Sequence, residues 1–293
     1  MRATEPVRDG YVERAGVKLH WEEFGESQPT IALLPTWSII HSRHWKFQVP
    51  YLARHHRVIT FDGRGCGRSD RPVGAASYTE NEFGADTIAV LDATGTEQAV
   101  LIGFSCGALW ALQVAADHPT RVLGVVTISP AVPLAPLDGE RNIHAFDEPT
   151  EATEGWAKYN RHYWDRDYEG FLSFFFGRMF TEAHSTKAIE DGVGWGLETD
   201  PPTLADAHHG LDACGRESTR TVCERVHQPV LVIHGDEDAI RPYAAGVALA
   251  ELTGGSLVTV KGGGHAPHCR DPILVNRLLT EFIAKHCVDR TAR

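Results

Sequence analysis

The stretch AVLIGFSCG, residues 99–107, decides the fold. Its first part, Ala99–Phe104, is continuously apolar, as expected for a strand buried on both faces of a parallel sheet. A helix-like segment follows from Cys106 to Ala116. The pattern Gly103-x-Ser105-x-Gly107 therefore lies at a strand-to-helix turn, the context in which a G-x-S-x-G motif exposes a serine hydroxyl. We expect Ser105 to be a nucleophile, with the flanking glycines letting the neighbouring chain pass without a clash.

Short apolar runs alternate with helix-like segments on both sides of this stretch. The predicted strands are Ile31–Leu34, Arg57–Phe61, Ala99–Phe104, Val122–Ile128, Val230–His234 and Ser256–Val260. The predicted helices include Tyr78–Ala93, Cys106–Ala116, Pro242–Leu252 and Asp271–Lys285. This alternation predicts an α/β fold with a doubly wound, mostly parallel sheet. Two β-prone runs around Ala15-Gly16 also predict an opening hairpin, formed by Tyr11–Glu13 and Val17–Phe24.

The alternation stops between about Pro133 and Glu224, where strand signals are few and aromatic residues are frequent. A segment of this length is too long for a structureless loop, so we expect a helical insertion over one edge of the sheet. The predicted division is a core of residues 1–132 and 225–293 with an insertion of residues 133–224. Helical spacing predicts one buried aromatic stripe within the insertion, made of Phe171, Phe174 and Phe175.

A serine nucleophile needs a general base and a carboxylate that orients the base, and both are expected in loops after later strands. We predict Asp238 as the acid, with Asp236 as a competitor that could instead stabilise its own turn. We predict His265, which follows three glycines, as the base. Its rival, His268, is expected to be a surface or loop residue. The same expectation holds for other histidines, namely His41, His44, His55, His56, His208 and His209.

Composition limits the partners and the compartment. The formal charge is −11, from 39 acidic and 28 basic residues, so nucleic acid and anionic lipid are not expected as partners. No apolar run is long enough to span a bilayer, and Met1–Gly10 lacks the apolar core of a signal peptide. We therefore expect a cytoplasmic protein with free thiols at its six cysteines, Cys66, Cys106, Cys214, Cys223, Cys269 and Cys287. No metal site is expected, since His268-Cys269 has no matching second pair.

Three further motifs carry a family resemblance. They are the D-x-R-G-x-G-x-S sequence of residues 62–69, the Gly235-x-x-Asp238-x-x-x-Pro242 loop, and Gly264-His265. With the serine turn, they make nearly the whole chain resemble the α/β-hydrolase superfamily. The resemblance implies an α/β-hydrolase fold, supports Asp238 over Asp236, and identifies the insertion as a helical cap over the pocket. It also implies a serine hydrolase that needs neither a metal nor an organic cofactor.

One departure from the family pattern concerns the oxyanion loop. The family usually has His-Gly after the strand that supplies this loop, whereas this chain has Pro35-Thr36. The alignment implies that the backbone N–H groups of Trp37 and Cys106 are the oxyanion donors. Thr36 in place of glycine puts the backbone angles of the loop in question, and Trp37 could instead be only a pocket wall.

A narrower resemblance links residues 37–46 and 193–199 to bacterial esterases that include macrolide-inactivating enzymes. It implies hydrolysis of a bulky apolar ester, with the lactone ring of a macrolide antibiotic as the more specific expectation. A C–C bond hydrolase, a thioesterase, a perhydrolase or a non-catalytic ligand-binding relative remains open. Epoxide hydrolases and haloalkane dehalogenases use an aspartate nucleophile, so Ser105 argues against them. The small-molecule substrate is the only partner predicted, and the oligomeric state is left open.

Overall fold

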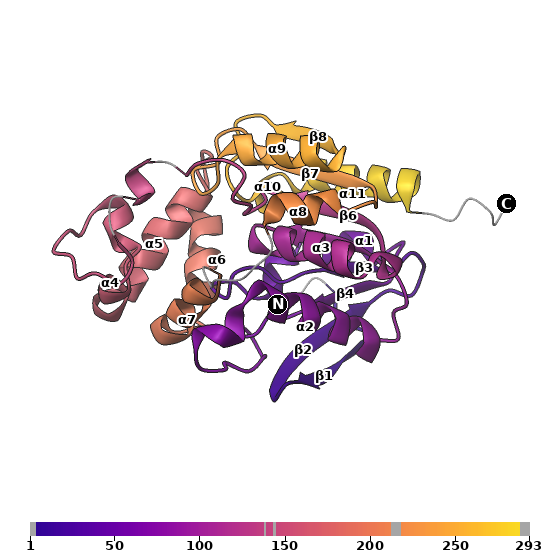
Figure 1. Ribbon diagram of the computed structural model, residues 1–293, viewed down its shortest axis with the longest axis horizontal. Helices are drawn as coiled ribbons and strands as arrows, with labels where there is room; N and C mark the ends of the chain where they lie inside the picture. Colours follow the sequence, from indigo (N-terminus) through magenta and orange to yellow (C-terminus); the bar gives the residue numbers. More distant parts are fainter. Residues whose placement is uncertain (1–3, 138, 143–144, 212–217, 288–293) are drawn as a thin grey trace.

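The computed structural model describes residues 4–137, 139–142, 145–211 and 218–287 (Figure 1). Eight strands form one sheet in the order β1-β2-β4-β3-β5-β6-β7-β8. The strand β2 is antiparallel to both of its neighbours, and all later pairs are parallel. The predicted α/β class with a mostly parallel sheet is therefore confirmed. The strands are β1 Arg8–Arg14, β2 Val17–Phe24, β3 Ile31–Leu33, β4 Val58–Phe61, β5 Ala99–Phe104, β6 Val122–Ile128, β7 Val230–Gly235 and β8 Ser256–Val260.

Helices cover both faces of the sheet. The helices α2, α3, α8 and α9 contact one another in series on one face, while α1 and α11 pack together with α10 on the other. The central strands β3–β7 are buried at every residue except the half-buried Leu123 of β6, because both faces are covered. These helices are α1 Val49–Leu52, α2 Glu80–Ala93, α3 Cys106–Asp117, α8 Thr219–Glu224, α9 Tyr243–Thr253, α10 Pro267–Arg270 and α11 Pro272–His286.

The opening hairpin forms as predicted. β1 and β2 pair from Arg8 with Glu23 to Arg14 with Val17. The two turn residues both have positive φ, 51° at Ala15 and 76° at Gly16, which is the backbone conformation of the tight turns that suit the twist of a hairpin.

The helices between β6 and β7 gather at one end of the molecule. Figure 1 shows α4, α5, α6 and α7 together beside the sheet rather than on its faces. Of the predicted aromatic stripe, Phe171 and Phe175 are buried, whereas Phe174 is only half-buried. The last helix before β7, α8, packs against α3 and α9 on the sheet. The elements of this segment are η4 Gly139–Asn142, η5 Gly155–Lys158, α4 Arg161–Arg166, α5 Tyr168–Met179, α6 Thr186–Gly196 and α7 Pro201–Leu211.

Among the described residues, none of the helices is both long and apolar enough to cross a membrane. Five cysteines lie in this part of the chain, and all five are free thiols. The sixth, Cys214, lies outside the described residues. The remaining short 3₁₀ turns are η1 Ser42–Trp45, η2 Ala75–Tyr78 and η3 Pro119–Arg121.

Candidate active site

Ser105 lies at the turn between β5 and α3, as the motif predicts. Its backbone angles, φ 53° and ψ −116°, are outside the regions of φ and ψ that residues with a side chain ordinarily adopt. The conformation is held from both sides: Ser105 N donates to Ile128 O at 2.9 Å, and Ser105 O accepts from Ala131 N at 3.0 Å. These hydrogen bonds to residues at and just beyond the end of β6 fix the strained turn at the start of α3.

The two motif glycines make this turn possible. A Cβ atom on Gly103 would lie 2.2 Å from Gly107 O, closer than any side chain tolerates. A Cβ atom on Gly107 would lie 2.1 Å from Pro35 O. The strand, the helix and the loop after β3 can therefore approach one another only because both positions lack a side chain.

Three loops bring Ser105, His265 and Asp238 together. His265 Nε2 lies 3.1 Å from Ser105 Oγ, and His265 Nδ1 lies 2.8 Å from Asp238 Oδ2. A carboxylate only accepts hydrogen bonds, so Nδ1 carries the proton and Nε2 presents its lone pair to the serine hydroxyl. The side chains of His265 and Asp238 are 1% and 0% exposed, which keeps water from competing for these bonds.

The structure separates the two candidate acids. The side chain of Asp238 is fully buried and also accepts backbone N–H groups from Ile240 at 2.8 Å and Arg241 at 2.9 Å. The side chain of Asp236 is 26% exposed and pairs with Lys261 at 3.1 Å. It also accepts Gly262 N at 2.7 Å, which is the turn-stabilising role considered for it. Of the two, only Asp238 faces the histidine.

A second histidine, which sequence reasoning missed, also binds the acid. His234 Nε2 lies 3.0 Å from Asp238 Oδ2, and the His234 side chain is fully buried at the end of β7. Burial alone would raise the pKa of Asp238, but the charge of His265 and the hydrogen bonds from His234 and His265 lower it well below its usual range. The lowered pKa favours the ionised form of Asp238, which accepts hydrogen bonds from both histidines. The spacing of four residues between His234 and Asp238 is not a recognised motif, so the sequence alone could not predict this contact.

The loop after β3, which is the predicted oxyanion loop, is tightly anchored. Leu34 N donates to Ile102 O at 2.9 Å, and the Trp45 indole donates to Leu34 O at 3.0 Å. Thr36 is buried without a positive φ, so this position does not require glycine. Among the described residues, neither Trp37 N nor Cys106 N has a hydrogen-bond partner, which leaves both N–H groups available to an oxyanion. The Trp37 ring, meanwhile, packs 5.6 Å from the ring of Phe175 and 5.9 Å from that of Tyr159.

The contact between Gly107 and Pro35 gives a direct test of this loop. We expect Gly107→Ala to lower kcat/KM about 10²–10³-fold, the usual cost of losing one oxyanion donor, because Pro35 must move and displace Trp37 N. Gly84→Ala in α2 is the matched control, since its Cβ would meet only Val114 at an ordinary 3.8 Å. Steady-state ester hydrolysis measures both variants, and equal activity would show that the loop does not position a donor.

Three histidines predicted to be surface or loop groups are instead buried. His41, His44 and His268 are at most 2% exposed. His44 Nδ1 lies 3.0 Å from His268 Nε2, and the His268 ring packs 4.5 Å from the ring of Phe104. The prediction was wrong because single positions on short 3₁₀ and α-helical turns carry no periodicity that reveals burial. Within the described part of the chain, no hydrogen bond joins His268 to Ser105. The His268 ring packs instead against Phe104, the last residue of β5.

The D-x-R-G-x-G-x-S loop, residues 62–69, holds neighbouring segments of the fold together. Asp62 accepts Ser42 N at 3.0 Å and Arg68 N at 2.9 Å, and Arg64 makes a buried double hydrogen bond to Asp86 at 2.7 and 2.8 Å. The loop therefore ties the oxyanion segment and α2 to the end of β4.

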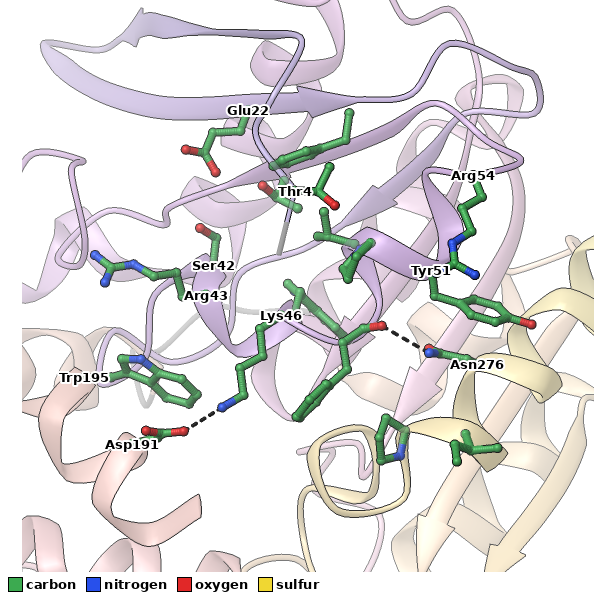
Figure 2. A pocket seen from close by; sticks show the side chains of 18 residues that line it. Thr4, Glu22, Ser42, Arg43, Lys46, Tyr51, Arg54, Asp191, Trp195 and Asn276 are labelled. Carbon is green, nitrogen blue, oxygen red and sulfur yellow. Dashed lines mark hydrogen bonds and ion pairs between the residues drawn. The ribbon is translucent and has the colours of Figure 1, made fainter. Parts of the chain in front are cut away.

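A cavity of about 680 Å³ opens elsewhere on the molecule. Figure 2 shows its lining side chains, with Lys46 bonded to Asp191 at 2.6 Å and Asn276 bonded to the backbone carbonyl of Phe47 at 3.1 Å. The lining comes mainly from β2, the segment η1–α1, α6 and α11, and includes none of Ser105, Asp238 and His265. This cavity is not the space above the serine.

Comparisons with known proteins agree with this architecture. A pimeloyl-[acyl-carrier protein] methyl ester esterase of Sodalis glossinidius is 27% identical over 270 residues, which cover 91% of this chain and 98% of that protein. A 2-hydroxymuconate semialdehyde hydrolase of Pseudomonas sp. is 24% identical over 278 residues, 92% of each chain. The solved structure of Est816, described as an N-acyl homoserine lactone degrading enzyme, superposes with a TM-score of 0.75 at 27% identity, covering 93% of this chain and 100% of that one.

The family model described as "alpha/beta hydrolase fold" matches residues 30–272, which include every strand from β3 to β8 and all three loops that meet at Ser105. The chain belongs to the alpha/beta hydrolase fold family.

Proposed function

We propose that this protein is a serine-dependent carboxylic ester hydrolase acting on a bulky, largely apolar ester. The observation that carries the proposal is the continuous hydrogen-bonded series Ser105–His265–Asp238, with an ionised acid at one end and a hydroxyl at the other. Esterases and a lactone-degrading enzyme among the similar proteins support the reaction class.

In the first step, His265 Nε2 takes the Ser105 proton while Oγ attacks the ester carbonyl carbon. Asp238 stabilises the imidazolium that forms. The negative charge on the carbonyl oxygen is received by the N–H groups of Trp37 and Cys106. The C–O bond of the ester then breaks, His265 returns its proton to the leaving alcohol, and an acyl-serine remains.

In the second step, a water molecule gives its proton to His265 and attacks the acyl-serine carbonyl. The same two N–H groups receive the second oxyanion. Collapse of this intermediate releases the carboxylic acid and returns the proton to Ser105 Oγ. Each step uses only groups of this chain and water.

The pH dependence follows from the base. Burial lowers the pKa of His265 below its ordinary 6.5, and the Asp238 carboxylate only partly offsets this. Because only neutral His265 can take the serine proton, we expect kcat/KM to be constant from pH 8 to below 6.5 and to fall only in more acidic solution. A pH profile of kcat/KM with an unionised ester checks this, and a midpoint above 6.5 would contradict it.

Aromatic rings from η5, α4 and α5 gather beside the oxyanion loop and support an apolar substrate. Trp37, Tyr159, Trp164 and Phe175 form a continuous set with ring centroids 5.5–6.3 Å apart. Such walls favour bulky apolar ligands.

The narrower candidate is a macrolide lactone, supported by the sequence resemblance of residues 37–46 and 193–199. Incubation with tylosin and several other macrolides, followed by mass spectrometry, tests it: a product heavier by one water is expected. No mass change across the panel would remove the macrolide and leave the reaction class intact.

C–C bond hydrolysis is the second candidate, and the 2-hydroxymuconate semialdehyde hydrolase relative favours it. Thioesterase and perhydrolase reactions would use the same three residues. A panel of esters, thioesters and vinylogous diketones separates these reactions by their relative kcat/KM. A purely ligand-binding protein is tested with a fluorophosphonate probe, which labels an activated serine and leaves an unactivated one unmodified.

The proposal also assigns a small-molecule partner and a cytoplasmic location. A formal charge of −11 disfavours phosphate backbones and anionic lipid surfaces as partners. The five described cysteines are free thiols, as is usual in a reducing compartment.

A further inference from the structure

Arg141 reaches the acid loop from the turn η4. Its Nη1 donates to Ile240 O at 2.6 Å, and Ile240 N in turn donates to Asp238 Oδ1. The guanidinium lies over two aromatic rings, 4.7 Å from the centroid of Trp156 and 5.4 Å from that of Tyr159. Arg141 is thus held on one side by the backbone beside the catalytic acid and on the other by the aromatic wall.

Arg241 is the next residue of the same loop. Its backbone N–H donates to Asp238 Oδ1 at 2.9 Å, and its side-chain Nε is buried without a hydrogen-bond partner. Burial and the charge of Arg241 together lower the pKa of Arg141 to about 10. Because Arg141 Nη1 hydrogen-bonds the carbonyl of Ile240, the residue before Arg241, the two arginines are neighbours at the acid loop.

Neither guanidinium has a carboxylate partner among the described residues, in a chain with 39 acidic side chains. Other arginines that are at least partly buried pair with carboxylates: Arg64 with Asp86 at 2.7 Å and Arg57 with Glu23 at 2.8 Å. Arg141 and Arg241 are likewise partly buried, and a charge withdrawn from water without a carboxylate partner costs free energy, so this pair needs a reason outside the fold.

The pair lies within electrostatic reach of the nucleophile. Burial raises the pKa of the Cys106 thiol, and the positive charge of Arg241 lowers it; the Glu80 carboxylate adds to the rise, and Arg141 adds to the lowering. Cys106 follows Ser105 directly and carries one of the proposed oxyanion N–H groups. The ring of Tyr159, under Arg141, is 5.9 Å from the ring of Trp37 on the oxyanion loop.

We infer that Arg141 and Arg241 form an anion subsite beside Ser105 that binds a carboxylate carried by the ester substrate. A guanidinium offers five N–H donors in a planar fork that matches a carboxylate, and Arg141 uses donors on Ile240 O and on Tyr159, which leaves others for a ligand. Contact with the aromatic faces orients the fork before the substrate arrives. The substrate class is then an ester with an apolar body and an anionic group. This inference rests on the proposed ester hydrolysis.

The test compares two esters of the same shape, 4-nitrophenyl monoglutarate and its terminal-amide analogue, which lacks the charge. We expect wild-type kcat/KM to favour the carboxylate about tenfold or more. Arg141→Gln and Arg241→Gln should each reduce that preference about tenfold, and Arg141→Lys, which keeps the charge and loses the fork, should reduce it less. Arg277→Gln on the exposed face of α11 removes the same charge and should leave the preference unchanged.

The outcomes separate the subsite from the reaction. A wild-type protein that hydrolyses both esters equally, or folded glutamine variants with the wild-type preference, would overturn the subsite and leave the ester hydrolase in place. In that case Arg141 only ties η4 to the acid loop. Failure to hydrolyse either ester, together with no fluorophosphonate labelling, would overturn the proposed function and the subsite with it. If one glutamine variant does not fold, the wild-type preference and the other variant decide.

Discussion

Replacing Ser105 with alanine should reduce ester hydrolysis by about 10⁴–10⁶-fold, since in the proposed mechanism this residue supplies the attacking oxygen. The fold should survive. The hydrogen bonds that hold the turn come from the backbone of Ser105, and alanine retains them. The change removes a single oxygen atom from a buried position, so any space that it leaves is small. Hydrolysis of a 4-nitrophenyl ester and thermal unfolding measure the two effects separately.

Ser129→Ala is the matched control. Ser129 also has a positive φ, 45°, and lies buried just after β6, the strand beside β5. Its Oγ has no hydrogen-bond partner among the described residues, so its removal should leave both activity and the melting temperature near the wild-type values. If Ser105→Ala kept more than a few per cent of the activity, or if a fluorophosphonate still labelled it, the nucleophile would have to be another residue.

Much of this arrangement could be predicted because it depends on local patterns. A continuous apolar run predicts a buried parallel strand, and a G-x-S-x-G motif predicts the turn that follows. The approach of three loops at one sheet edge then follows from topology, since the carboxyl ends of parallel strands meet there. Ser105 and His265 follow from these local patterns. Asp238 and Asp236 follow the same strand, so the preference for Asp238 gains its main support from the family motif.

Contacts made across the insertion could not be predicted. No sequence pattern near Arg141 predicts its hydrogen bond to Ile240 O, 99 residues later. The burial of His44 and His268 likewise depends on which short turns pack together, and single residues on such turns show no period. The sequence predicts His234 only as the last residue of a strand, and the fold places its ring against Asp238. Side-chain contacts over long sequence separation are set by packing, and packing leaves no local signal.

Replacing Asp238 with asparagine should lower kcat by about 10⁴-fold, because the amide NH₂ can donate to His265 Nδ1 and so favours the tautomer whose Nε2–H cannot accept the serine proton. The variant should also be less stable. The pKa of Asp238 is lowered in the folded protein, so the ionised carboxylate stabilises the fold at pH values above its unfolded pKa, and asparagine lacks this contribution at neutral pH.

Asp236→Asn removes a carboxylate two residues away on the same loop and is the matched control. Its partners are the exposed Lys261 and the backbone of Gly262, and an exposed ion pair contributes about 0–1 kcal/mol, so kcat should stay within about twofold of the wild type. Single-turnover and steady-state kinetics of both variants, with thermal unfolding alongside, decide between the two carboxylates. A loss at Asp236 with Asp238→Asn near wild type would move the acid role to Asp236. For Asp236 to face His265, the loop would have to shift by two residues. The hydrogen bonds from Ile240 and Arg241 to Asp238 oppose such a shift.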